Sequence, residues 1–127
     1  MKPLVDILEE SSVLVKETGQ WILQQSTQFS SSDIIYKGTN DLVSFVDQQA
    51  EAKLKQGLSQ IFPEAGFIAE ETAATYGDVW NGYYWVIDPL DGTTNFLHKL
   101  PVFAVSVGLI FEKQPILGLI YEPNRDE

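Results

Sequence analysis

The hydrophobic pattern changes at Pro63, and this change constrains the fold more than any other feature of the chain. Before Pro63, apolar residues recur with a helical period near 3.6, whereas short apolar runs bounded by turn residues follow it. The 127 residues suit one globular domain, and we find no repeat or linker in them. We therefore expect an α+β fold, a two-layer sandwich of two long helices on a mainly antiparallel sheet.

Two amphipathic helices are predicted before Pro63. The first begins after Pro3 and ends near the polar stretch QQSTQFSSSD. Its stripe consists of Val5, Leu8, Val15 and Ile22, with the small residues Ser11, Ser12 and Gly19 on or near it. The second helix stops before Pro63 and carries Val46, Ala50, Leu54, Leu58 and Ile61. Ser44 and Asp47 have the spacing of a capping box, which predicts the start of this helix.

Four strands are predicted after Pro63. They are the stretches GFIAEE, YYWVID, AVSVGLIFE and ILGLIYEP, and the turn-like KQP separates the last two. Between the second and third strands, GTTNFLHKL has room for about two helical turns. The aromatic residues Trp80, Tyr83, Tyr84 and Trp85 are interpreted as core and edge residues of the sheet rather than as a platform for stacking bases.

Composition excludes several classes of function. Eighteen acids against eight bases give a net charge of −10, which repels phosphate backbones and anionic membrane surfaces. The chain has no cysteine, so disulfides and thiolate metal sites are excluded, and a reducing compartment is favoured. No apolar run approaches the roughly 20 residues of a membrane-spanning helix, and the N-terminus lacks a secretory signal. We expect a cytoplasmic protein that binds neither nucleic acid nor membrane.

The stretch WVIDPLDGTTNF carries two acids, Asp88 and Asp91, out of a strongly apolar strand. Asp-Pro and Asp-Gly are ordinary turn dipeptides, so a plain turn is one interpretation of this stretch. Three features favour a functional site instead. The acids follow an apolar strand, a second acidic pair, Glu70 and Glu71, ends another apolar strand, and the segment after Asp91 can begin a helix whose N–H groups attract an anion.

A hard divalent cation would explain this combination of acids. Mg²⁺ prefers oxygen ligands, keeps several waters and bridges substrate phosphate oxygens. Asp88 and Asp91, three residues apart across a tight turn, could face one point, with the Leu90 carbonyl as a further oxygen ligand. Glu70 from the neighbouring strand would complete a cage for two ions, which would stabilise the attacking and leaving oxygens of a phosphoryl displacement.

These residues resemble the inositol monophosphatase family, whose members are Mg²⁺-dependent, lithium-sensitive sugar phosphatases. The motifs DLVSFVDQQAE, FIAEET, WVIDPLDGTTNFLHKLPVFAVSVGL and GLIYEPNRDE occur in the family's order and at about its spacing, over nearly the whole chain. The resemblance implies metal ligands at Glu70, Asp88, the Leu90 carbonyl and Asp91. It implies substrate binding by Asp91, Gly92 and Thr93, with phosphate contacts through the N–H groups of Gly92 and Thr93. It also implies that Asp47, Glu70 and Thr93 orient the attacking water.

The implied activity is hydrolysis of a sugar or inositol phosphate monoester by metal-activated water, without a covalent phosphoenzyme. Fructose-1,6-bisphosphatase, bisphosphate nucleotidase and histidinol phosphatase are alternatives, because the wider superfamily uses the same metal block. Family members are about twice as long as this chain. We therefore expect residues 1–127 to be the N-terminal metal-binding domain of a longer enzyme, weak or inactive alone. This chain also has Ala69 where the family usually has glycine.

Several residues keep a second interpretation. Asp47 either caps its helix or points into the site. Glu71 is either an acid of the site or a solvated charge at the end of its strand. Lys37 corresponds to a lysine that the family places near its metal, but it also suits a surface loop. His98 is expected to cap or pack rather than catalyse. A non-catalytic interaction module related to the family is the rival from another class, and the strand ILGLIYEP, with an unpaired edge, predicts a homo-oligomer.

Overall fold

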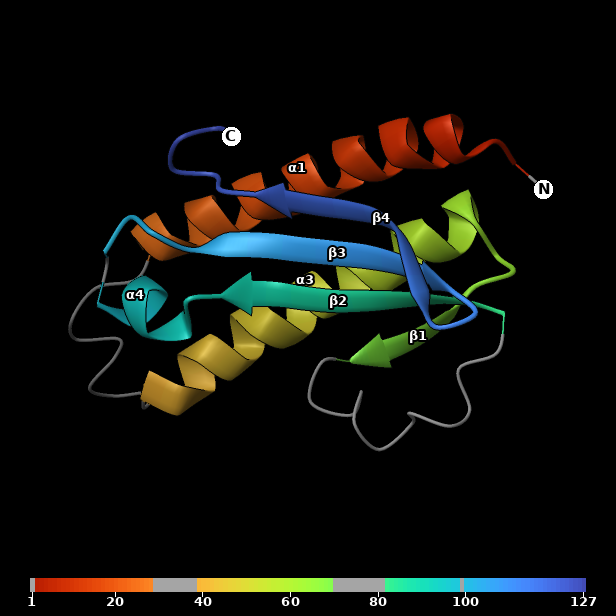
Figure 1. Cartoon of the computed structure of the whole chain (residues 1–127). Helices are drawn as coiled ribbons and strands as arrows, with labels where there is room; N and C mark the ends of the chain where they lie inside the picture. The colour runs from red at the N-terminus through yellow and green to blue at the C-terminus, as the bar shows by residue number, and fades with distance from the viewer. Residues whose placement is uncertain (1, 29–38, 70–81, 99) are drawn as a thin grey trace.

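A four-stranded sheet with two long helices on one face makes up the part of the chain that the structure describes (Figure 1). The structure is a computed structural model that describes residues 2–28, 39–69, 82–98 and 100–127. The helices are α1 (Leu4–Gln28), α3 (Thr39–Ile61) and the short α4 (Thr93–Leu97). The strands are β1 (Gly66–Ala69), β2 (Tyr83–Asp91), β3 (Ala104–Phe111) and β4 (Gln114–Tyr121). The predicted two-layer α+β fold is confirmed.

The sheet has the strand order β1-β2-β3-β4 and is mainly antiparallel, as predicted. β2 pairs with β3, and β3 with β4, in antiparallel register, whereas β1 and β2 are parallel. The last paired residue of β1, Ala69, lies opposite Ile87, the residue before Asp88. β1 and β2 therefore run toward the same end of the sheet, and β1 ends opposite Ile87, four residues before β2 ends beside α4 (Figure 1).

The core lies between the sheet and the two helices. Alternate residues of β2 and β3 point toward α1 and α3, as the strand period of two requires. These residues are at most 2% exposed: Trp85, Ile87, Val105, Val107 and Leu109. α3 contributes the row Val46, Ala50, Leu54 and Leu58, which is at most 2% exposed and confirms these four residues of its predicted stripe. Ile61, the fifth, is half-buried and packs against the core. Tyr83 stacks on Phe111 with ring centroids 4.4 Å apart, so the aromatics described here serve the core and its rim.

The stripe of α1 is only partly as predicted. Val15, Ile22, Ser11 and Gly19 are buried, but Val5 and Leu8 are 59% and 38% exposed, and Ile7 is fully buried in their place. Ile7 and Leu8 are about 100° apart around the helix and flank the line of Val15 and Ile22 on opposite sides. In the structure the side that carries Ile7 faces the core.

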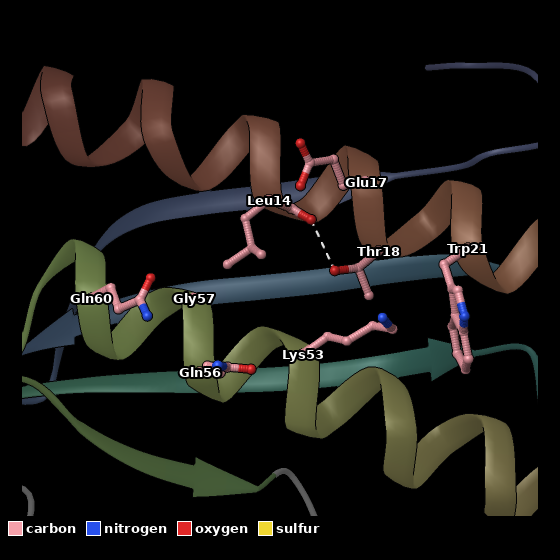
Figure 2. Close-up of a pocket in the computed structure, with 8 residues that line it drawn as sticks. All are labelled: Leu14, Glu17, Thr18, Trp21, Lys53, Gln56, Gly57 and Gln60. Carbon is pink, nitrogen blue, oxygen red and sulfur yellow. Dashed lines mark hydrogen bonds between the residues drawn. The ribbon is translucent and has the colours of Figure 1, made fainter.

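The two long helices approach closely where α3 has a glycine. A Cβ atom at Gly57 would lie 2.5 Å from Leu14 Cδ2, so any larger residue would require the Leu14 side chain to move off the backbone of α3. Figure 2 shows this contact, together with the Thr18 hydroxyl, which donates a 2.9 Å hydrogen bond to the Leu14 carbonyl. None of the described helices is both long enough and apolar enough to cross a bilayer.

Three local predictions are wrong. α3 begins at Thr39, so Ser44 and Asp47 lie inside the helix and do not mark its start. Residues three apart also face each other along a helix interior, which is why their spacing misleads. The third strand ends in a two-residue turn at Glu112 and Lys113, both with positive φ, so KQP is not the turn. Such turns match the twist of a hairpin, and Pro115 is tolerated because β4 is an edge strand. α4 has five residues instead of two turns.

Candidate functional site

A β-bulge near the end of β2 places Asp88 and Asp91 on the same side of the sheet. Asp88 lies opposite Ser106 and Asp91 opposite Ala104, so three steps along β2 match two steps along β3. In a regular strand, residues three apart point to opposite faces. The extra residue of the bulge shifts the in-out alternation of side chains by one position. Both carboxylates therefore lie on the side of Ser106 and Ala104, away from the helix layer. The predicted tight turn at this position is instead a bulged strand.

The residues between the two acids anchor the bulge. Leu90 is 3% exposed and belongs to the core cluster, and Pro89 is buried as well. Asp88 is half-buried, whereas Asp91 is exposed at the end of the strand. The apolar side chains thus hold the segment in place, while one carboxylate faces solvent and the other is partly shielded.

Gly92 turns the chain from β2 into α4. Its φ of 93° lies in the left-handed region, which side-chain-bearing residues rarely adopt. A Cβ atom at this position would also lie 3.0 Å from the Val102 carbonyl oxygen. Phe96 is fully buried and packs edge-on against Phe103, with ring centroids 5.5 Å apart, which fixes α4 beside the acids. Thr93, the first residue of α4, is exposed.

A pocket of about 190 Å³ adjoins Asp91. It is lined by Asp91, Gly92, Asn95, Val102, Phe103, Ala104 and Glu122. Val105 lies opposite Tyr121, so Ala104 is next to Glu122 in the same register, and Ala104 is also opposite Asp91. Asp91, Ala104 and Glu122 therefore form a row across three chain segments. Glu122 was not predicted as a site residue, because only strand register brings it near Asp91. Asn95 was not predicted either, and it lines the pocket from α4, four residues after Asp91.

Three N–H donors hold the Glu122 carboxylate. Its Oε1 accepts hydrogen bonds from the backbone N–H of Asn124 (3.0 Å) and from Asn124 Nδ2 (2.9 Å), and its Oε2 accepts one from the backbone N–H of Arg125 (2.9 Å). Partial burial opposes ionisation, but these hydrogen bonds outweigh it, so the pKa of Glu122 is lowered. The carboxylate is therefore ionised at neutral pH and fixed in orientation.

The other predicted site residues divide into two groups. Asp47 is half-buried on α3, which packs against both β2 and α4, so it lies on an element beside the site. Glu70, Glu71 and Lys37 lie outside the described residues. Within residues 2–28, 39–69, 82–98 and 100–127, no three His, Asp or Glu side chains form a metal-binding group. His98 is exposed, and its backbone N–H caps α4 by donating to the Thr94 carbonyl.

A second pocket, of about 250 Å³, lies between α1 and α3, in the helix layer (Figure 2). Leu14 and Gly57 contribute to its lining from the two helices, and Trp21 stands at one end with the Lys53 ammonium 5.1 Å from its ring centroid. Glu17 is the one carboxylate among its lining residues. This pocket does not include the acids of β2, so the bulge and the pocket beside Asp91 are the candidate site.

Residues 5–127 match the model of the inositol monophosphatase family. The chain belongs to this family. It is 38% identical over 130 residues to inositol monophosphatase 2 of Solanum lycopersicum, in a match that covers 100% of the chain and 47% of the relative. It is 35% identical over 127 residues to a fructose-1,6-bisphosphatase/inositol-1-monophosphatase of Aquifex aeolicus, again covering 47% of the relative.

Solved structures of inositol monophosphatases have the same fold. The protein from Anabaena superposes with a TM-score of 0.75 at 30% identity, covering 100% of this chain and 42% of that one. Inositol monophosphatase II of Staphylococcus aureus superposes with a TM-score of 0.74, covering 93% of this chain and 43% of that one. The chain thus spans about half the length of the inositol monophosphatases that it matches.

Proposed function

We propose that the chain is the N-terminal metal-binding domain of a Mg²⁺-dependent phosphatase that hydrolyses a sugar or inositol phosphate monoester. Family membership supports the reaction class, because the family's name describes the removal of one phosphate from inositol. The observation that carries the proposal is the bulge in β2, which puts Asp88 and Asp91 on one side of the sheet. An apolar strand that delivers two carboxylates to one point is a suitable frame for a hard cation.

The donor atoms at the bulge fit such an ion. Asp88 and Asp91 offer carboxylate oxygens, and the Leu90 carbonyl between them is a third hard donor. The register of β1 supports Glu70 as a further ligand, since Ala69 lies opposite Ile87 and Glu70 is the next residue in the chain. When bound, Mg²⁺ supplies Lewis-acid stabilisation of phosphate charge and activates a water.

The remaining roles belong to side chains and amides around this point. In the proposal, the N–H groups of Gly92 and Thr93 bind the phosphate, and Asp91 contacts both metal and substrate. The Thr93 hydroxyl, with Asp47 and Glu70, orients the attacking water. Support for Thr93 is its exposure at the start of α4, and support for Asp47 is its place on a helix that packs against β2 and α4.

A titration and an activity assay test the proposal together. We expect the purified chain to bind Mg²⁺, or Mn²⁺ as a probe, and to lose binding when Asp88 and Asp91 are both changed to Asn. Hydrolysis of inositol 1-phosphate by the chain alone should be slow or undetectable. Turnover on the order of 1 s⁻¹ or more would show that these 127 residues form a complete enzyme. No cation binding by a folded chain would reject the metal site and favour the interaction module.

The substrate is open to direct comparison. With a protein that extends over the length of the relatives, initial rates on inositol 1-phosphate, fructose 1,6-bisphosphate, a nucleoside bisphosphate and histidinol phosphate would rank the alternatives. We propose inositol 1-phosphate as the best substrate and inhibition by lithium at millimolar concentration. A higher kcat/KM for any of the other three would assign the protein to another branch of the superfamily.

Self-association and a cytoplasmic location complete the proposal. β4 is an edge of the sheet, and its Ile120 side chain is 74% exposed, which favours pairing with a second copy of the chain. Light scattering during size-exclusion chromatography should give the mass of a dimer or larger species for the wild type and of a monomer for Ile120→Lys. A monomeric wild type would remove the homo-oligomer from the proposal. The lack of cysteine supports the cytoplasmic location, because the cytoplasm is a reducing compartment in which disulfides are rare.

A further inference from the structure

We propose that Glu122 is a positioning residue for the cation at Asp91, because its fixed negative charge attracts the ion to that end of the sheet. The inference rests on the proposed metal site. Glu122 belongs to the turn after β4 and is not part of the acidic motif of β2. Its relation to that motif follows from the row that Asp91, Ala104 and Glu122 form across the sheet.

The pocket that Asp91 and Glu122 both line has room for a hydrated ion. Neighbouring strands lie about 4.8 Å apart, so two steps across the row separate the Cα atoms of Asp91 and Glu122 by about 10 Å. Ala104, between them, contributes only a methyl group. The pocket has a volume of about 190 Å³. One water occupies about 30 Å³, so this volume corresponds to about six waters. Mg²⁺ usually keeps several of its waters when it binds to protein carboxylates.

The turn after β4 holds Glu122 in place independently of any ion. Besides the three N–H donors to its carboxylate, the Glu122 backbone exchanges hydrogen bonds with Glu127, at 2.7 Å and 3.2 Å. Asp126 of the same turn accepts a 2.7 Å hydrogen bond from the Tyr121 hydroxyl, and Lys16 of α1 approaches Asp126 to 3.4 Å. The Tyr121 ring in turn rests on Gly19 of α1, where a Cβ atom would lie 2.4 Å from it. The Glu122 carboxylate is therefore held in place by its own turn, and contacts with α1 hold that turn.

The expected effect is moderate and depends on salt. A unit charge about 10 Å from a divalent ion in a water-like medium changes its affinity by about fourfold. We expect Glu122→Gln to weaken Mn²⁺ binding by two- to fivefold at 10 mM salt, measured by electron paramagnetic resonance of free Mn²⁺. At 0.5 M salt the difference should fall below about 1.5-fold, because the screening length becomes shorter than the separation.

Matched variants separate this role from a structural one. Glu64→Gln makes the same charge change in the turn before β1, at the opposite end of the sheet, and should leave the affinity within 1.5-fold. Asn124→Ala removes a donor to Glu122 but keeps its charge, so it should weaken Mn²⁺ less than Glu122→Gln does. Thermal melts confirm that each variant is folded. If Glu122→Gln does not fold, Mn²⁺ should still broaden the Glu122 amide signal of the wild type before that of Glu64.

Four results would overturn the inference. Unchanged Mn²⁺ affinity in folded Glu122→Gln would remove the role of Glu122 and leave the metal site intact. Equal weakening by Glu64→Gln would show that only the net charge matters. Absence of Mn²⁺ binding by the wild type would remove the metal site together with the role of Glu122. In the Mn²⁺ titration of the wild type, broadening of the Glu64 amide signal before that of Glu122 would also contradict the inference.

Discussion

The two halves of β2 differ in regularity. From Tyr83 to Asp88 the strand follows the register of β3 residue by residue, and its inward side chains, such as Trp85 and Ile87, are buried against the helices. Between Asp88 and Asp91 the register shifts, and the strand ends at a glycine with positive φ. The first half obeys the period of a strand, whereas the second half departs from it and gains two carboxylates on one side.

If the proposed metal site is correct, this difference separates the residues of β2 that stabilise the fold from the residues that bind the ion. The regular half buries large apolar side chains, and each contributes a few kcal/mol when fully buried. The bulged half has its acids on the outer side, while Leu90 keeps it attached to the core. Substitutions in the first half should therefore change folding, and substitutions in the second half should change ion binding.

The largest expected effect comes from the regular half. Trp85 is fully buried, and its replacement by alanine should lower the free energy of unfolding by about 3–5 kcal/mol because a large cavity forms. Urea denaturation followed by circular dichroism would measure this. Val86→Ala, on the half-buried outer side, is the matched control and should cost less than about 1.5 kcal/mol. Equal costs would contradict the assignment of inner and outer faces.

Gly92 tests the end of the bulged half. Gly92→Ala should lower the free energy of unfolding by about 1–3 kcal/mol, since the left-handed φ is strained for alanine and the Val102 carbonyl is 3.0 Å from the new Cβ. Gly82→Ala has a similar φ of 79° but no neighbour within 4 Å, so it isolates the backbone strain. Gly118→Ala, with neither feature, should be close to neutral. A Gly92 variant as stable as the Gly118 variant would reject the turn geometry.

Asp91 tests the separation itself. Asp91→Asn should change the free energy of unfolding by less than about 0.5 kcal/mol, as expected for an exposed residue. The same change should weaken Mn²⁺ binding by at least about tenfold, because it removes a charged ligand. Calorimetric titration and urea denaturation of one preparation would give both values. A large loss of stability with unchanged Mn²⁺ affinity would reverse our assignment.

The smallest expected effect is on the pH dependence of folding. The pKa of Glu122 is lowered by its hydrogen bonds, and that of Asp126 by the Tyr121 hydroxyl and Lys16. A lowered pKa in the folded state stabilises the protein above the unfolded pKa, and this contribution is lost as pH falls through the folded pKa. Stability should therefore decline below about pH 4.5. The urea midpoints of Glu122→Gln should decline less between pH 5 and pH 3, and an equal decline would contradict the contribution of Glu122.

Sequence patterns were sufficient for the fold because the core follows simple periods. Val46, Ala50, Leu54 and Leu58 recur every four residues, and the apolar strands end where turn residues begin. The stripe of α1 was less predictable, because Ile7 and Leu8 flank it on opposite sides and the apolar pattern alone did not show which of them faces the core. The hairpin turn at Glu112 was missed because neither of its residues is a glycine, asparagine or aspartate.

The candidate site was predictable only in part. The acids of WVIDPLDG stand out because two carboxylates follow one strongly apolar strand. The bulge that places them on one face could not be recognised from the sequence. Glu122 lies 31 residues beyond Asp91 in the chain and reaches its pocket only through the pairing of β2 with β3 and β3 with β4. Asp47 was predicted to mark the start of its helix because its spacing from Ser44 is that of a capping box, but both residues lie inside α3.

The central claim is that the bulged end of β2 binds a cation, and paramagnetic relaxation tests it most directly. Substoichiometric Mn²⁺ is added to the ¹⁵N-labelled chain, with Mg²⁺ as the diamagnetic control, and the amide signals are recorded. We predict that the signals of Leu90, Asp91, Gly92 and Thr93 broaden first and recover when excess Mg²⁺ is added. Broadening that begins instead at Glu10 and Glu17 of α1, or that is uniform over the acidic surface, would contradict the claim.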